Sequence, residues 1–167
     1  MFRLRDFQPD DAPKLLALFK DTIRRVNCRD YCPAQIAAWA TDELTLEAWS
    51  SKFPGRRTFI AETASSNTPR IAGFGDLEPD GHLDRFFVAA DHQGQGVGRM
   101  LLAAIIAHAR ALKVPRIRTE ASITARPFFA RCGFREVTNQ LVFYRGAAFL
   151  NYRMELPLDE PGILSAG

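Results

Sequence analysis

The feature that most constrains this chain is a glycine-rich turn between an apolar strand pattern and an apolar helix pattern. Residues 86–102 read FFVAADHQGQGVGRMLL, and Gly94, Gly96 and Gly98 stand two residues apart. Glycine lets backbone N–H groups approach a ligand without a clash from Cβ. The helix start adds unpaired N–H donors and the positive end of its dipole. The turn therefore predicts an anion site, best suited to phosphate.

The common nucleotide motifs do not fit this turn. The dinucleotide fingerprint G-x-G-x-x-G fails because position 99 is Arg, and it would have to follow the first strand of a βαβ unit rather than a hairpin. The phosphate loop G-x-x-x-x-G-K-[ST] is absent from the sequence. On spacing alone, a purely structural strand–helix turn remains an alternative.

The remaining periodicities predict one α+β domain of order β-α-α-α-β-β-β-α-β-α-β-β. Its 167 residues suit about one domain, which we expect over residues 1–158, with 159–167 as a flexible C-terminal tail. Helical spacing is expected over 15–26, 36–39, 46–49, 96–112 and 125–131. Strand patterns cover 2–7, 57–63, 70–78, 82–89, 114–121, 134–145 and 147–156.

Composition excludes several classes of protein. With 47% hydrophobic residues and a net charge of +3, the chain is not expected to be disordered. The longest apolar run, 100–107, is far shorter than the ~20 residues of a membrane span, and the start of the chain lacks the apolar core of a signal peptide. No lipidation signal appears at either end, so we expect no membrane partner.

The cysteines and the distribution of charge bear on metal binding, cellular location and nucleic-acid binding. The three cysteines, Cys28, Cys32 and Cys132, form neither C-x-x-C nor a zinc spacing, which predicts no metal and a cytoplasmic location. The isoelectric point near 9.0 permits a nucleic-acid partner. The 22 basic and 19 acidic residues are spread along the chain without a basic stripe, so we expect no nucleic acid.

The turn and its neighbours resemble one known family. Gln93-x-x-Gly96-x-Gly98 matches the Q/R-x-x-G-x-G/A signature of the GNAT superfamily of N-acetyltransferases. The preceding strand, ending FFVA, is similar to the family strand that lies along the pantetheine arm of coenzyme A. Residues 125–134, ARPFFARCGF, resemble the family's short helix ending in Gly-Phe. The resemblance covers roughly residues 2–156.

The resemblance implies a GNAT-like fold and an acyltransferase. The fold would be a mixed, mostly antiparallel twisted sheet of about seven strands flanked by helices, with strands 82–89 and 117–121 splayed like a V. The enzyme would transfer acetyl from acetyl-CoA to a primary amine of a small molecule or peptide, by direct attack on the thioester. A homodimer is a family-level expectation, because members often pair through sheet edges or C-terminal strands.

The resemblance also assigns a coenzyme A site. Pantetheine would run beside the strand before the turn, the diphosphate would sit on N–H groups of residues 93–99, and the Val88 N–H would meet the thioester oxyanion. Arg99, Arg131 or another nearby cation would meet the 3′-phosphate, with a solvated surface charge as the alternative for each arginine. The residues expected to bind the cofactor are Phe87, Val88, Gln93, Gly94, Gln95, Gly96, Val97, Gly98, Arg99, Phe128, Phe129 and Arg131.

Catalysis needs a base, because a lysine-like amine of pKa ~10.4 arrives protonated and only the neutral amine attacks. In family members, polar residues four and six positions before the Val88 equivalent face the acceptor, which points to Asp84 and His82. Strand alternation places these two on one face with Phe86, and Leu83, Arg85 and Phe87 on the other. For Asp84 the alternative is an ion pair with Arg85 or another arginine. For His82 the position next to a turn weighs against a catalytic role.

The general acid is where the chain departs from the family. Many members place a Tyr four residues before the Gly of Gly-Phe, and that position is Phe129 here. Tyr144, our candidate, or Tyr152 would then protonate the thiolate, unless solvent does. Tyr31 and Trp39 are candidates for an acceptor wall, with plain core packing as the alternative. Phe129 is also the best argument for the competing hypothesis of a non-catalytic acyl-CoA-binding or sensor module, and Asp84 and His82 argue against it.

Overall fold

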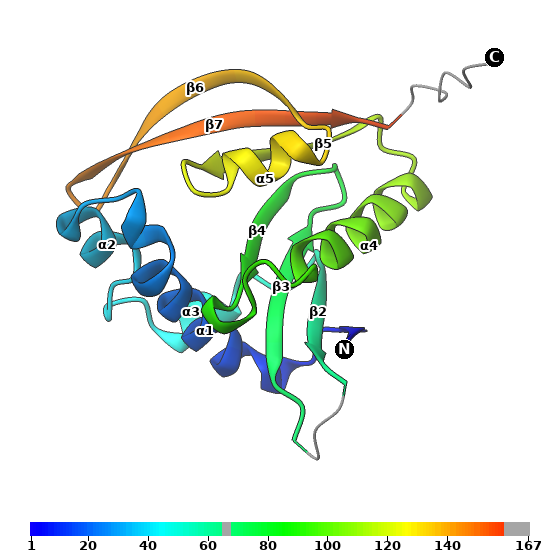
Figure 1. Ribbon diagram of the computed structural model, residues 1–167, viewed down its shortest axis with the longest axis horizontal. Coiled ribbons are helices and arrows are strands. Elements are labelled where there is room, and N and C mark those ends of the chain that lie inside the picture. The colour runs from blue at the N-terminus through cyan, green and yellow to red at the C-terminus, as the bar shows by residue number, and fades with distance from the viewer. Residues whose placement is uncertain (65–67, 159–167) are drawn as a thin grey trace.

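The computed structural model describes residues 1–64 and 68–158, and it has the predicted order of elements (Figure 1). The remaining residues, 65–67 in an expected turn and 159–167 in the expected tail, lie outside the described part. No helix of that part is both long and apolar enough to cross a membrane. The elements are β1 (Phe2–Asp6), η1 (Pro9–Asp11), α1 (Ala12–Arg25), η2 (Asn27–Arg29), α2 (Pro33–Trp39), α3 (Leu46–Ser50), β2 (Arg57–Thr63), β3 (Ile71–Leu77), β4 (Leu83–Val88), η3 (Ala90–His92), α4 (Val97–Ala111), β5 (Arg116–Ser122), α5 (Arg126–Arg131), β6 (Arg135–Tyr144) and β7 (Ala147–Pro157).

The strands form two antiparallel sheets that touch at one point. The first has the order β1-β2-β3-β4 and the second β5-β7-β6. A parallel bridge between His82 and Arg118 joins them, and the Thr119 hydroxyl donates to the Leu83 carbonyl over 2.8 Å. Beyond this point β4 and β5 belong to separate sheets, as the expected V requires. The expected α+β fold with two diverging strands is therefore confirmed.

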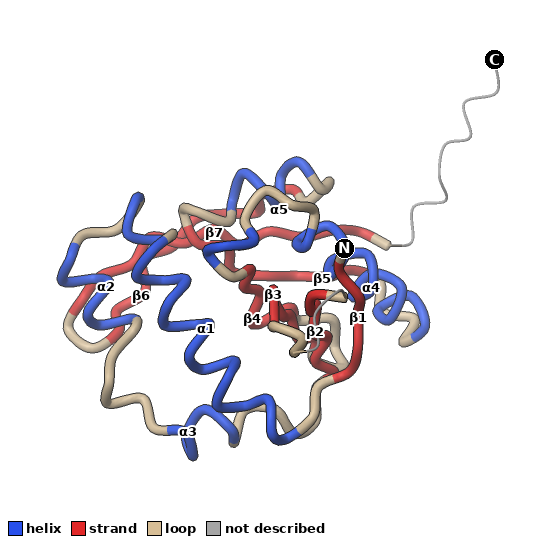
Figure 2. The backbone as a smooth tube through the Cα atoms, turned by 60° about the horizontal axis from the view of Figure 1, so that its bottom comes forward, coloured by secondary structure: helices blue, strands red, loops and turns tan. Residues whose placement is uncertain are grey.

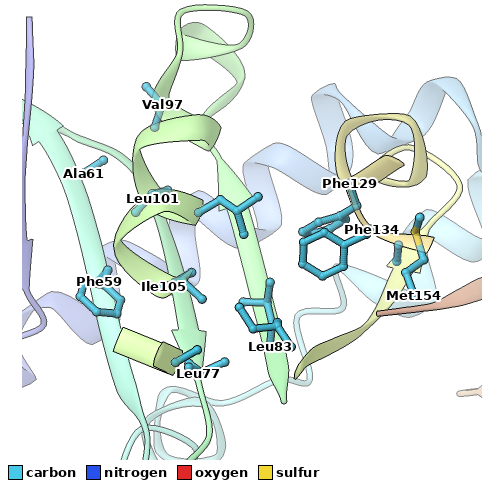
Figure 3. Packing of buried hydrophobic residues seen from close by; sticks show 14 of the residues in the cluster. Phe59, Ala61, Leu77, Leu83, Val97, Leu101, Ile105, Phe129, Phe134 and Met154 are labelled. Carbon is cyan, nitrogen blue, oxygen red and sulfur yellow. The ribbon is translucent and has the colours of Figure 1, made fainter. Parts of the chain in front are cut away.

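Helices cover both faces of the first sheet. Figures 1 and 2 show α1, α2 and α3 on one side of β3 and β4, and α4 on the other. On the α4 side, Leu101 and Ile105 are fully buried together with Leu83 and Phe129 (Figure 3). We call this the α4 core.

The opposite face carries a second core, which we call the α1 core. Leu15 and Ile23 of α1 are fully buried there, and Trp49 of α3 is 2% exposed. They pack with Ile60 and Phe74 of the sheet. Because a strand sends alternate side chains to its two faces, β3 and β4 supply both cores and position the segment between them.

A β-bulge interrupts the pairing of β3 with β4. Gly75 lies opposite Phe86, and Leu77 lies opposite Leu83, so the single residue Asp76 faces two residues of β4. The extra residue on one strand shifts the alternation of side chains beyond it.

The bulge changes which side chains of β4 share a face, so the alternation expected from the sequence does not hold along the whole strand. Leu83 belongs to the α4 core and Phe86 packs against it, although alternation puts them on opposite faces. Arg85 stacks on aromatic rings of the α1 core, and Phe87 packs against the same core. Asp84 is on the α1 side as well, where it pairs with Arg56 of the loop after α3. Simple alternation was therefore wrong across residues 84–85, and Asp84 and Phe86 do not share a face.

A buried ion pair fixes this bulge. The Arg85 guanidinium contacts the Asp76 carboxylate over 2.5 Å and 2.6 Å, and the Arg85 backbone N–H donates to the same carboxylate over 3.1 Å. The guanidinium carbon lies 4.1 Å from the ring centroid of Phe53 and 4.7 Å from that of Trp49. One side chain therefore ties the bulge to the α3 region.

We predict that Asp76→Asn destabilises the protein by ~3–5 kcal/mol, because it leaves the buried Arg85 charge without its partner. The matched control is Asp6→Asn, which breaks the exposed pair with Arg57 and should cost at most ~1 kcal/mol. Urea denaturation of the two variants measures both free energies of unfolding. Equal losses would contradict a structural role for the buried pair.

Candidate active site

A cleft of about 950 Å³ opens where the two sheets separate. Pockets of ~300–1,000 Å³ are typical of small-molecule sites. The glycine-rich turn, the start of α4, and α5 line part of the cleft. The rest is lined by α1, the α1–α2 loop, α2, α3, β6 and β7, together with the adjoining parts of β4 and β5.

The glycine-rich turn has the geometry of an open cradle. Gly94 and Gly96 have φ of +71° and +86°, and no atom lies within 4 Å of a Cβ placed on either. These glycines are therefore required by backbone conformation, not by crowding. The first helical bond runs from the Met100 N–H to the Gly96 carbonyl over 3.0 Å, so the N–H groups of Val97, Gly98 and Arg99 have no acceptor within the helix. The turn can accept an anion as the sequence indicates.

Gly98 has a different role from its two neighbours. A Cβ on Gly98 would lie 3.1 Å from the Phe128 ring of α5, so this residue is small because α5 packs there. Phe128 stacks on Phe86 of β4 with centroids 5.5 Å apart. Phe129 is 2% exposed and packs against Phe134 at 5.0 Å. The aromatic rings fix α5 beside the start of α4.

The structure brings nearly all the expected cofactor-binding residues to this cleft. The exception is Gln95, whose side chain donates to the Asp91 carbonyl over 3.0 Å instead. Arg99 and Arg131 lie at the cradle end, at the start of α4 and the end of α5. The expected residues that line the cleft are Phe87, Val88, Gln93, Gly94, Gly96, Val97, Gly98, Arg99, Phe128, Phe129 and Arg131.

The edge of β4 presents a backbone donor to the cleft. The Ala89 N–H donates to the Ala72 carbonyl of β3 over 2.8 Å, and ladder bonds alternate along an antiparallel pair. The Val88 N–H therefore points away from β3, towards the gap left by β5. The Val88 carbonyl already accepts hydrogen bonds from the Gln93 side-chain amide over 2.7 Å and from the Thr22 hydroxyl over 3.3 Å. The N–H is left available to a ligand.

Asp84 lies in the cleft and is held by an arginine. Its carboxylate contacts the Arg56 guanidinium over 2.6 Å, and the same guanidinium contacts Glu78 at 2.8 Å and Asp76 at 3.4 Å. The expected alternative of an arginine ion pair is thus present, with Arg56 and not Arg85 as the partner. Nothing in the sequence pointed to Arg56, which stands in a loop 28 residues before Asp84.

His82 is outside the set of cleft-lining residues described above. Its Nε2 lies 2.7 Å from a carboxylate oxygen of Glu120, and its Nδ1 lies 3.6 Å from Glu78. The hydrogen bond with Glu120 raises the pKa of His82, and the same bond lowers the pKa of Glu120. Both ring nitrogens of His82 face carboxylates and the residue does not line the cleft, so this arrangement disfavours His82 as a general base.

Glu120 is a cleft residue that the sequence reasoning missed. The available signal was strand alternation, since Ile117, Thr119 and Ala121 of β5 are buried and Glu120 lies between two of them. The pattern predicts that Glu120 faces away from the core, but it gives no sign that β4 diverges there and leaves a cleft.

The tyrosines divide into three environments. Tyr144 lines the cleft from the β6–β7 hairpin, and its hydroxyl accepts from the Arg145 Nε over 3.2 Å. Tyr152 is covered by the Arg126 guanidinium, 4.2 Å from its ring centroid, and is not among the cleft residues. Tyr31 lines the cleft with its hydroxyl accepting from the Ile123 N–H over 2.9 Å, and burial raises its pKa.

Three comparisons identify the family. The sequence model of the acetyltransferase (GNAT) domain matches residues 27–156. The chain is 32% identical over 152 residues to the uncharacterized N-acetyltransferase YafP of Escherichia coli K12, covering 91% of this chain and 93% of that protein.

Solved structures of N-acetyltransferases have the same fold. A GCN5-related N-acetyltransferase from Rhodopseudomonas palustris superposes with a TM-score of 0.85 at 30% identity, covering 93% of this chain and 95% of that one. The PaiA N-acetyltransferase from Thermoplasma acidophilum, solved in complex with coenzyme A, has a TM-score of 0.74 at 15% identity, covering 94% and 99%. The chain therefore belongs to the GNAT family of N-acetyltransferases, and it is an acyltransferase whose co-substrate is acetyl-CoA.

Proposed function

We propose that this enzyme transfers the acetyl group of acetyl-CoA to the primary amine of a small molecule or peptide, by direct attack of the amine on the thioester. The observation that carries the proposal is the cleft itself. It contains an open anion cradle, the Asp84 carboxylate, and the outward N–H of Val88 on the strand edge.

Coenzyme A would run from the cradle along the edge of β4. Its diphosphate would accept bonds from the N–H groups at the start of α4, where the helix dipole also favours negative charge. Arg99 and Arg131 would offer charge to the 3′-phosphate. The Val88 N–H would donate to the thioester oxygen, which gains negative charge as the amine attacks.

Asp84 would take the ammonium proton of the acceptor, directly or through a water that it positions. Arg56 would orient this carboxylate through the 2.6 Å contact. The new C–N bond forms as the C–S bond breaks, the attacking nitrogen releases its second proton to solvent, and the departing thiolate takes a proton from Tyr144 or from solvent. His82 would act only by positioning Glu120. The alternative of a non-catalytic acyl-CoA-binding module is disfavoured, because the family is one of acyltransferases.

We predict that Gly96→Glu weakens coenzyme A binding by ~100-fold or more, which is ~2.7 kcal/mol. The added carboxylate would repel the diphosphate at the centre of the cradle. The matched control is Gly146→Glu, because Gly146 has a similar φ of +79°, equally open surroundings and no place in the cleft. Isothermal titration calorimetry with coenzyme A compares the two, and equal affinities would refute the cradle.

We predict that Asp84→Asn lowers kcat by ~10²–10⁴-fold and flattens the rise of turnover with pH, because a proton acceptor is lost. The control is Asp80→Asn, which removes a carboxylate paired with Arg118 outside the cleft. The measurement is release of free thiol from acetyl-CoA across a pH series. An unchanged pH profile in Asp84→Asn would remove Asp84 from the mechanism.

We predict that His82 contributes stability in a pH-dependent way. Its pKa in the folded protein is raised by Glu120, so the contribution is complete below ~6.5, the pKa of an unfolded chain, and is lost as the pH rises through the folded value. The difference in free energy of unfolding between the wild type and His82→Gln should therefore shrink from pH 6 to pH 9. Urea denaturation measures it, and a difference that grows with pH would contradict the His82–Glu120 pair.

A further inference from the structure

Four aromatic rings from distant parts of the sequence meet along the cleft. They are Tyr31 before α2, Trp39 at the end of α2, Phe87 of β4 and Phe149 of β7, and all four line the cleft. We call them the aromatic wall. Ring centroids are 5.4 Å apart for Tyr31–Trp39, 5.9 Å for Tyr31–Phe149, 6.0 Å for Trp39–Phe149 and 6.4 Å for Trp39–Phe87.

The four rings contact one another. Centroid separations of ~4.5–7 Å are those of aromatic side chains packed together. Trp39, Phe87 and Phe149 are only partly buried, and their exposed surface borders the cleft. The rings therefore support one another and present a continuous apolar surface to whatever enters.

The apolar surface extends beyond the rings. Leu44, Val142 and Leu150 also line the cleft. A ligand that laid hydroxyl groups against this surface would lose their hydration without gaining hydrogen bonds, which is costly. An apolar ligand would instead gain from removing its own surface, and that of the wall, from water.

The wall is placed next to the reacting groups. Phe87 directly precedes Val88, whose N–H faces the gap between the strands. Phe87 also shares the α1 face of β4 with Asp84, because the bulge turned Asp84 to that side. A group packed against Phe87 would therefore lie on the same face of β4 as the Asp84 carboxylate and beside the residue that presents the Val88 N–H.

We propose that the acceptor is a primary amine carried on an aromatic or similarly bulky apolar group, which packs on the aromatic wall. This inference rests on the proposed function, since it assigns the acceptor of the same reaction. The charged residues of the cleft, among them Lys52, Asp84 and Glu120, are not part of the wall. The wall is therefore available to the apolar group that carries the amine.

The test compares primary amines that differ in the group attached to the amine. Acetylation of phenethylamine, ethanolamine and putrescine is followed by release of free thiol, and binding of each to the coenzyme A complex is measured by calorimetry. We expect kcat/KM for phenethylamine to exceed that for ethanolamine by ~50-fold, as burial of a phenyl group allows. A preference for ethanolamine or putrescine would overturn the wall and leave the proposed function intact.

Two variants test whether the preference for phenethylamine arises at the aromatic wall. Phe149→Ser should raise KM for phenethylamine by ~10-fold or more, while KM for ethanolamine and the affinity for coenzyme A stay the same. The matched control is Phe143→Ser, on the same hairpin but 78% exposed and outside the cleft, which should change none of these constants.

The remaining outcomes separate the two proposals. Equal effects of Phe149→Ser on all amines, or no binding of phenethylamine to the wild type, would overturn the wall. Binding of phenethylamine that Phe149→Ser abolishes, without acetylation of any amine, would support the wall and refute the proposed function.

Discussion

The site depends on where two strands stop being neighbours. The Thr119 hydroxyl holds the Leu83 carbonyl at 2.8 Å, and beyond this contact β4 pairs only with β3 and β5 only with β7. A sheet edge exposes unpaired backbone groups, which are usually a liability. Here the edge lies inside a cleft, so the Val88 N–H becomes a fixed donor whose direction is set by the strand and needs no side chain.

The bulge is the second constraint, because it determines which way the Asp84 carboxylate faces. An extra residue in β4 turns Asp84 towards the α1 side, and the buried Arg85–Asp76 pair holds that arrangement. Arg56 then connects Asp76, Glu78 and Asp84 in one ionic group. The position of the carboxylate is therefore determined by buried packing as much as by the strand that carries it.

Much of the fold was accessible from sequence, because the signals were local. Glycine spacing, helical periodicity and the strand patterns predicted the order of the elements, and β2 was placed with its observed bounds over residues 57–63. Alternation failed at residues 84–85, because a bulge inserts one residue without a distinctive composition. Arg56 and Glu120 were missed for a different reason: their roles depend on loops and strands that approach only after folding. Most of the residues predicted to bind the cofactor do line the cleft, because a turn and the helix that follows it carry their own geometry.

The hydroxyl of Tyr31 makes this residue harder to replace than the other members of the aromatic wall. It accepts from the Ile123 N–H just after β5, so this ring is anchored to the strand that forms one arm of the V. Trp39 and Phe149 contact it through their rings alone. Substitutions in the aromatic wall should therefore begin with Trp39 and Phe149, because a change at Tyr31 would also disturb the backbone next to β5.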